Sequence, residues 1–177
     1  MDYLLNKPPV GNLYLELLDF MLVVSDRFYL VVRSDVQYDH NTENILNGLK
    51  PFMLNSLSSV EWPGTEILDE NKKATIYFYK VTPASIDFLR VNSSDLFQWK
   101  GPNYPDDLSF LRKDGSIIVM NTAHEGIMEI DFRSDEVDIL RHRSSDSLLQ
   151  SALVATNVGI EQPRSDVLIH MKKWWMC

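Results

Sequence analysis

Residues 99–131 read WKGPNYPDDLSFLRKDGSIIVMNTAHEGIMEID, and this stretch holds the features that decide the fold. Asp114-Gly115 separates two apolar runs, 108–111 and 117–120. Asp-Gly tolerates the positive φ that a two-residue type I′ turn requires, so the stretch predicts a β-hairpin closed by that turn. A third strand is predicted after it, because apolar and charged residues alternate at Met128, Glu129, Ile130, Asp131 and Phe132.

The polar residues of this stretch fall where strands should begin or end. Gly101-Pro102 and Pro105 forbid helix and delay entry into the first strand. Tyr104, Asp106 and Asp107 are therefore expected on a loop leading into that strand, and His124-Glu125-Gly126 is expected to connect the second strand to the third.

Length and composition indicate one soluble domain. The chain has 177 residues, of which 45% are hydrophobic and 24% charged. No window approaches the roughly 20 apolar residues of a membrane-spanning helix. The apolar run 13–24 is broken by acidic residues and lacks the flanks of a signal peptide, so we expect a buried helix, no membrane association and a cytoplasmic protein. Cys177 is the one cysteine, which excludes an intrachain disulfide and a cysteine-based metal site.

The formal net charge of −8 bears on the class of partner. Nucleic-acid binding rests on a clustered basic surface, and none is visible in the sequence. An acidic surface attracts basic partners over long range. Acidity also simply keeps a protein soluble, which is the commoner reason for it.

Helical periodicity recurs in several places. Asn12 can cap a helix over 13–22, and Asn41 or Thr42 can cap one whose apolar positions continue to Leu57. Pro51 interrupts the second pattern, which predicts a kinked helix or two short helices. Thr82-Pro83 supplies a cap and a first helical residue for a further helix.

Two further strands and a loop are predicted from alternation and turn residues. Residues 28–32 are rich in β-branched and aromatic side chains, as in the central strand of a sheet, and 74–81 alternate with Ile76 and Phe78 on one face. Residues 60–66 are expected to form a loop in which Gly64 occupies the positive-φ position of a type II turn.

The remaining part, 133–177, is predicted to be a helical extension. Ser134 can cap its first helix, whereas Trp174-Trp175 suits a short amphipathic helix or a strand equally well. Altogether the sequence predicts a single α+β domain over 1–177, with a mainly antiparallel sheet of about five strands and helices packed on one face.

Several ordered motifs carry a family resemblance. They are EWPGTE at 61–66, residues 77–80, Trp99, PDDLSF at 105–110, the Asp114-Gly115 pair and His124-Glu125. Over residues 13–132 the chain resembles a small group of uncharacterised bacterial proteins often labelled stage III sporulation protein AH. The resemblance implies a soluble single-domain protein and supplies no catalytic residues.

One candidate site is catalytic. His124 and Glu125 beside Asp106 and Asp107 could perform acid–base chemistry, since a histidine paired with carboxylates is the usual material for it. The competing interpretation is structural, with the aspartates bonding loop amides. No second histidine has metal-ligand spacing and no glycine-rich phosphate loop occurs, so we expect neither a metal nor a cofactor.

The other candidate site is a binding surface of loop aromatics and nearby carboxylates. Large aromatics on loops anchor protein interfaces, although they also close the ends of cores. The predicted contact residues are Glu61, Trp62, Glu66, Trp99, Tyr104, Asp106 and Asp107. The favoured function is thus a non-catalytic module, immunity-like, antitoxin-like or regulatory, that binds a basic protein. The alternative is a small hydrolase or other enzyme with its site at His124, Glu125, Asp106 and Asp107.

Overall fold

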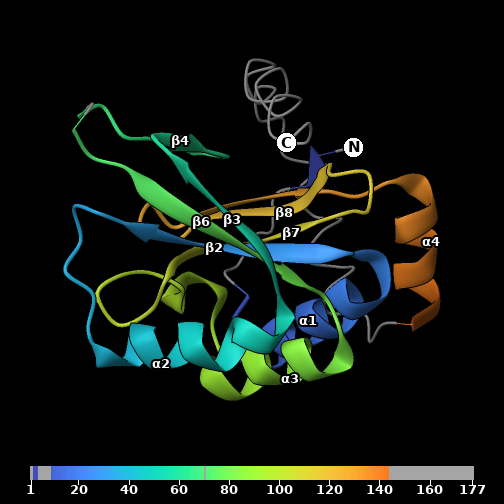
Figure 1. Ribbon diagram of the computed structural model, residues 1–177. Coiled ribbons are helices and arrows are strands. Elements are labelled where there is room, and N and C mark those ends of the chain that lie inside the picture. Colours follow the sequence, from blue (N-terminus) through green and yellow to red (C-terminus); the bar gives the residue numbers. More distant parts are fainter. Residues whose placement is uncertain (1, 4–8, 70, 144–177) are drawn as a thin grey trace.

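The main sheet has seven strands, all antiparallel to their neighbours, among the residues that the computed structural model describes, namely 2–3, 9–69 and 71–143 (Figure 1). Neighbouring strands are hydrogen-bonded throughout. From one edge to the other the order is β1 (Asp2–Tyr3), β9 (Ile127–Asp131), β8 (Ile117–Thr122), β7 (Asp106–Leu111), β2 (Arg27–Arg33), β6 (Ala74–Lys80) and β3 (Met53–Ser59).

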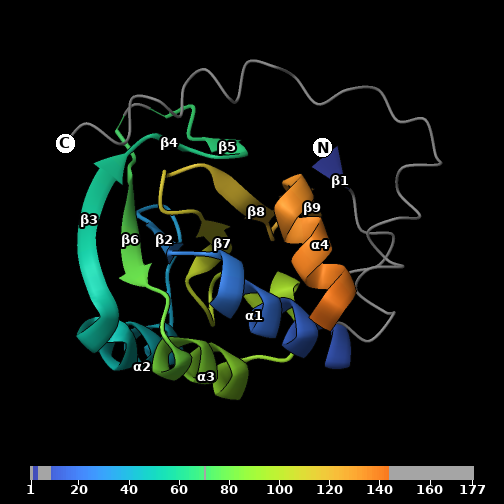
Figure 2. The same ribbon diagram turned by 90° about the vertical axis from the view of Figure 1, so that its right-hand side faces the viewer.

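One face of the sheet is covered by three helices, as Figure 2 shows from the side. These are α1 (Asn12–Val24), α2 (His40–Leu49) and α3 (Pro83–Asn92), and two single-turn 3₁₀ helices, η1 (Lys50–Phe52) and η2 (Leu96–Gln98), accompany them. A fourth helix, α4 (Ser134–Arg143), follows β9 and adds side chains to the same core. The predicted α+β fold with a mainly antiparallel sheet and helices on one face is confirmed.

The predicted helical extension is described only as far as the end of α4. The expected helix or strand at Trp174-Trp175 lies outside the described residues.

Strand β2 is the centre of the sheet, between β6 and β7. Phe28 and Leu30 belong to the main core under the helices, whereas Tyr29 and Val31 belong to a smaller core on the opposite face. A strand buried on both faces needs a nearly continuous apolar run, which is why these residues predicted a central strand.

The opposite face carries a small β-hairpin made of β4 (Glu61–Trp62) and β5 (Thr65–Glu66). Residues 60–66 were expected to form a loop, and that expectation is wrong, although each strand has only two residues. The turn is as predicted, because Gly64 has φ +83° after Pro63. Trp62 covers the smaller core together with Ile67.

Strand β3 replaces the second half of a predicted helix. Residues 53–57 were expected to continue the helical pattern beyond Pro51, but the chain leaves η1 at Met53 and pairs with β6. Asn55, Ser56 and Ser58 are weak helix formers, and pairing with β6 satisfies one side of the backbone.

The β7–β8 hairpin forms where it was predicted, but its turn is not the predicted type I′. The amide of Gly115 donates to the carbonyl of Arg112 (3.0 Å), and the amide of Arg112 donates to the carbonyl of Ser116 (2.8 Å). Among the three loop residues only Gly115 has positive φ, at +87°. This is a three-residue loop with a type I turn and a glycine bulge, which needs one left-handed residue instead of two.

Helix starts were predicted to within one or two residues, but three of the four assigned caps were wrong. The first residue of α1 is Asn12 and its N-cap is Gly11. Asp39 caps α2 by accepting from the amides of Asn41 and Thr42. Ser134 lies inside α4, where the amide of Val137 donates to the carbonyl of the preceding Arg133. Thr82 caps α3 in a capping box, with Pro83 at the first helical position. This cap was predicted correctly.

Candidate functional site

The candidate site is built on two consecutive aspartates at the start of β7. Asp106 and Asp107 were expected on an exposed loop, but both lie in the strand and are buried. The register between β2 and β7 shifts between Tyr29 and Val31, which leaves an extra residue on β7. Asp107 lies at this bulge with φ +61°. The bulge turns the two carboxylates toward different partners.

The carboxylate of Asp106 is hydrogen-bonded to two loops at the start of β7. Its carboxylate accepts hydrogen bonds from the hydroxyl of Tyr38 and from the amide of Gly101 (2.8 Å). Burial raises the pKa of Asp106, while the bonds to Tyr38 and Gly101 oppose that rise. This aspartate therefore holds the 99–105 loop against the connection between β2 and α2.

Asp107 bonds to the hairpin on the other face. Its carboxylate accepts from Nε1 of Trp62 (2.8 Å) and from the amide of Ala123 (2.9 Å). Asp107 has no exposed surface and Trp62 is 3% exposed. A hydrogen bond from a neutral indole to a buried carboxylate is charge-assisted, so it fastens β4 to β7 and to the end of β8.

His124 lies at the surface above Asp107. Its Nδ1 is 3.8 Å from Oδ1 of Asp107, and its Nε2 is 3.8 Å from a carboxylate oxygen of Glu125. The interaction with Asp107 raises the pKa of His124, against partial burial, which lowers it. The structure thus brings His124, Glu125 and Asp107 together, whereas Asp106 bonds to Tyr38 and does not join them. The predicted four-residue catalytic cluster is not formed as one group.

The prediction that Trp62 and Trp99 form an exposed binding surface is wrong. Trp99 is fully buried in the main core, where its Nε1 donates to the hydroxyl of Tyr14 (3.0 Å) and its ring packs edge-on against Tyr104. Trp62 is buried on the opposite face of the sheet. Both tryptophans do lie next to Asp107, because its amide donates to the carbonyl of Trp99 (2.9 Å). Both are members of hydrophobic cores and do not form an exposed surface.

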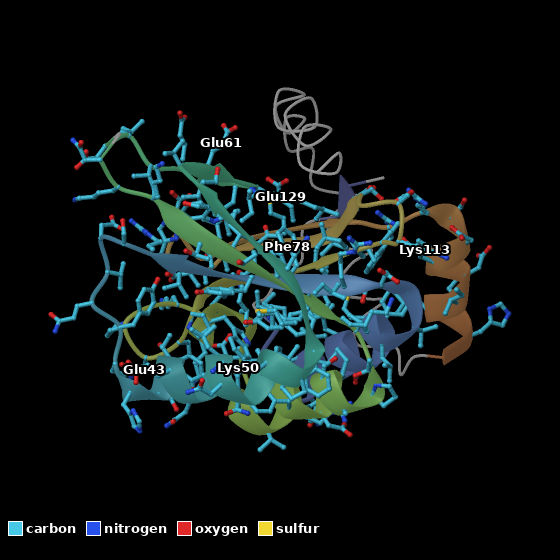
Figure 3. All side chains as sticks on the ribbon, in the orientation of Figure 1. Glu43, Lys50, Glu61, Phe78, Lys113 and Glu129 are labelled. Carbon is cyan, nitrogen blue, oxygen red and sulfur yellow. The ribbon has the colours of Figure 1, made fainter. Side chains whose placement is uncertain are left out.

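Glu61 and Glu66 remain as accessible acidic residues on the hairpin. They are directly opposite each other in the β4–β5 register, with Glu61 partly exposed and Glu66 exposed. Among the described residues, no cation lies within ion-pair distance of either carboxylate. Figure 3 shows Glu61 and Glu129 on the side of the sheet away from the helices. The hairpin therefore presents two carboxylates that face each other, and the buried Trp62 holds the hairpin on the sheet.

Sequence reasoning missed the residues that organise the two aspartates. Tyr38 is 68 positions from Asp106, and the amide of Ala123 has no side-chain signature. No pattern in the sequence points to either. Among the residues described, no three His, Cys, Asp or Glu side chains gather as a metal ion would require. None of the helices in that part of the chain has the length and apolar character to span a bilayer.

Comparisons with protein-family models, with characterised proteins and with solved structures found no match. The resemblance to the sporulation-labelled group stays a prediction from the motifs.

Proposed function

We propose that this protein is a non-catalytic binding module whose β4–β5 hairpin recognises a basic segment of another protein. The observation that carries the proposal is the pair Glu61 and Glu66, which face each other across the hairpin with no cation beside them in the described part of the chain. Like charges directly opposite on paired strands destabilise the pairing. A lysine or arginine from a partner would relieve that repulsion.

The hairpin is held in place before any partner arrives. Trp62 bonds to Asp107, and Gly64 lies directly over Thr122 and Met120 of β8. A contact surface that is already ordered loses less conformational entropy on binding. This support favours the hairpin as a recognition element over an incidental loop.

The charge of the whole chain supports the same class of partner. A net charge of −8 attracts a basic protein over long range and accelerates encounter. An exposed ion pair contributes only about 0–1 kcal/mol, so the two glutamates would set orientation and specificity more than affinity. On this combination we assign the protein to the immunity-like, antitoxin-like or regulatory modules that would neutralise a basic partner.

The experiment measures binding of fluorescent octa-arginine by anisotropy at low and physiological salt. The test variant is Glu61→Gln/Glu66→Gln. The matched control is Glu43→Gln/Asp135→Asn, which removes the same charge from exposed positions on α2 and α4. We expect the hairpin variant to lose about tenfold in affinity, which corresponds to about 1.4 kcal/mol, and the control to lose much less.

Equal weakening in the two double variants would contradict the proposal, because it would show attraction by net charge alone. So would wild-type protein that does not bind the peptide at low salt, where electrostatic attraction is strongest.

A further inference from the structure

Strand β3 is the outer strand of the sheet in the described part of the chain, and its one irregularity is a register shift against β6 between Met53 and Asn55. Its sequence, MLNSLSS, contains no charge and no proline, and all of its residues except Ser59 are exposed. Within the described residues β6 is its only neighbour in the sheet. Natural proteins protect such edges with lysine, proline, bulges or a covering segment, because an open edge pairs with another strand. Beyond that shift, residues 55–59 form a regular and neutral edge, which is suited to pairing.

The direction of its backbone groups follows from the neighbouring strands. The carbonyl of Lys73, just before β6, accepts from the amide of Ser34 on the β2 side (2.8 Å). In an antiparallel ladder both backbone groups of a residue point to the same neighbour, and successive residues alternate. Even-numbered residues of β6 therefore point to β3, where their partners are Asn55, Leu57 and Ser59. The amides and carbonyls of Ser56 and Ser58 point outward.

We propose that two copies of this chain pair through β3, antiparallel, about a two-fold axis near its centre. Outward groups at Ser56 and Ser58 of one copy would bond to the same groups of the other, which is the self-complementarity that a two-fold interface requires. Met53, Leu54 and Leu57 are 47%, 49% and 37% exposed, and pairing would cover part of that apolar surface.

The distribution of charge favours a second copy of this chain as the partner, and it favours antiparallel pairing of the two strands. In a chain of net charge −8, a neutral strand is a surface on which two copies can meet without placing like charges opposite each other. Lys50 lies just before the strand and Glu61 just after it, at its two ends (Figure 3). Antiparallel pairing brings the basic end of one copy to the acidic end of the other, whereas parallel pairing would bring like ends together.

The test is sedimentation equilibrium of the full chain at roughly 100 μM, a concentration that populates dimers of micromolar affinity. Wild-type protein is expected to show twice the chain mass. Ser56→Pro removes an outward N–H but no bond to β6, so the fold should persist and the mass should halve. Ser56→Thr keeps that N–H and should remain dimeric.

A second variant covers the case in which proline disturbs the strand. Ser58→Lys places a charge on the edge strand, so it should yield monomer with unchanged circular dichroism. Its thermal midpoint should match that of the wild type at concentrations low enough for the wild-type dimer to dissociate. Wild-type protein that is monomeric throughout would overturn the proposal, leaving the edge open for a different extended chain. A dimer that survives both Ser56→Pro and Ser58→Lys would also overturn it, because the contact would then lie elsewhere.

Discussion

Asp107 combines an unusual backbone conformation with a buried charge. Its φ of +61° is uncommon for a residue with a side chain, and aspartate tolerates it better than most because its short side chain bonds locally. The carboxylate is satisfied by Trp62 and Ala123, so its burial does not leave an orphaned charge. One residue thus fixes both the bulge in β7 and the position of the β4–β5 hairpin.

Gly64 tests the contact between that hairpin and β8. A Cβ at this position would lie 2.4 Å from Oγ1 of Thr122, in addition to the strain of φ +83°. We expect Gly64→Ala to lower the free energy of unfolding by about 1–2 kcal/mol through φ and by about 1–3 kcal/mol more through the contact. Chemical denaturation measures the loss.

Gly126 is the matched control for Gly64. It has φ +68°, and a Cβ at this position would meet nothing within 4 Å, so Gly126→Ala reports the backbone cost alone. Equal destabilisation by the two alanines would show that the hairpin yields easily, and it would remove the support that β8 gives to the hairpin.

His124 should make stability depend on pH. Its folded pKa is raised by Asp107 above that of the unfolded chain, so the folded state binds the proton more tightly. The stabilisation is complete below the unfolded pKa and is lost as pH rises through the folded pKa. Wild-type protein should therefore exceed His124→Gln in stability near pH 5, and the difference should shrink by about pH 9.

The measurement is the unfolding free energy of both proteins across that range. His40→Gln is the control, because His40 and its partner Glu43 are largely exposed and gain little from their 3.5 Å pairing. A difference between wild type and His124→Gln that grows toward alkaline pH would contradict the assigned role of Asp107.

At the scale of elements, a buried ion pair ties α4 to the end of the β7–β8 hairpin. Nε of Arg112 donates to one oxygen of Glu136 and Nη2 donates to the other, both at 2.6 Å. Nη1 of Arg112 also donates to the carbonyl of Ile117 (2.7 Å), and Glu136 accepts from the amide of Arg133 (2.8 Å). Arg112 and Glu136 are each 5% exposed. One guanidinium therefore joins two strands and a helix start.

Breaking this pair should loosen α4 before the rest of the fold. Glu136→Gln removes the buried counter-charge of the guanidinium and leaves it only the half-exposed carboxylate of Asp131, 3.7 Å from Nη1. We expect this loss to cost about 3 kcal/mol. Hydrogen exchange should rise in α4 while α3, which packs elsewhere, keeps its protection. Arg112→Met/Glu136→Leu removes both charges and should be less destabilising than Glu136→Gln. An equal rise of hydrogen exchange in α4 and α3 would contradict this role of the ion pair.

Element types were predictable from the sequence where local pattern and tertiary pairing agree. Residues 28–32 are dense in β-branched and aromatic side chains, and residues 74–80 alternate between the two faces. Both segments are strands in the structure. Residues 53–57 carry a helical spacing of apolar positions that the pairing of β3 with β6 overrides. Such a choice depends on a partner strand that lies about twenty residues away, which a local pattern does not contain.

At the scale of the molecule, fold class was predictable and the candidate site was only partly so. The alternation and the Asp-Gly turn indicated an antiparallel sheet, which the structure confirms. Which polar residues are exposed was not predictable, because it follows from packing across the sheet. Trp62 and Asp107 are 45 positions apart and bury each other, whereas Glu61, the neighbour of Trp62, stays accessible.

The strand order also has a consequence for how the chain matures as it leaves the ribosome. The central strand β2 is made early, yet Arg27 pairs with Lys80 on one side and with Leu111 on the other. The apolar residues of β2 must therefore wait until residue 80 has been made for their first partner strand and until residue 111 for their second. Pairing at such separation is slow and leaves unpaired edges open to aggregation. Nascent chains that end before β7 are accordingly expected to recruit chaperones, whereas chains that extend beyond β9 can close the sheet.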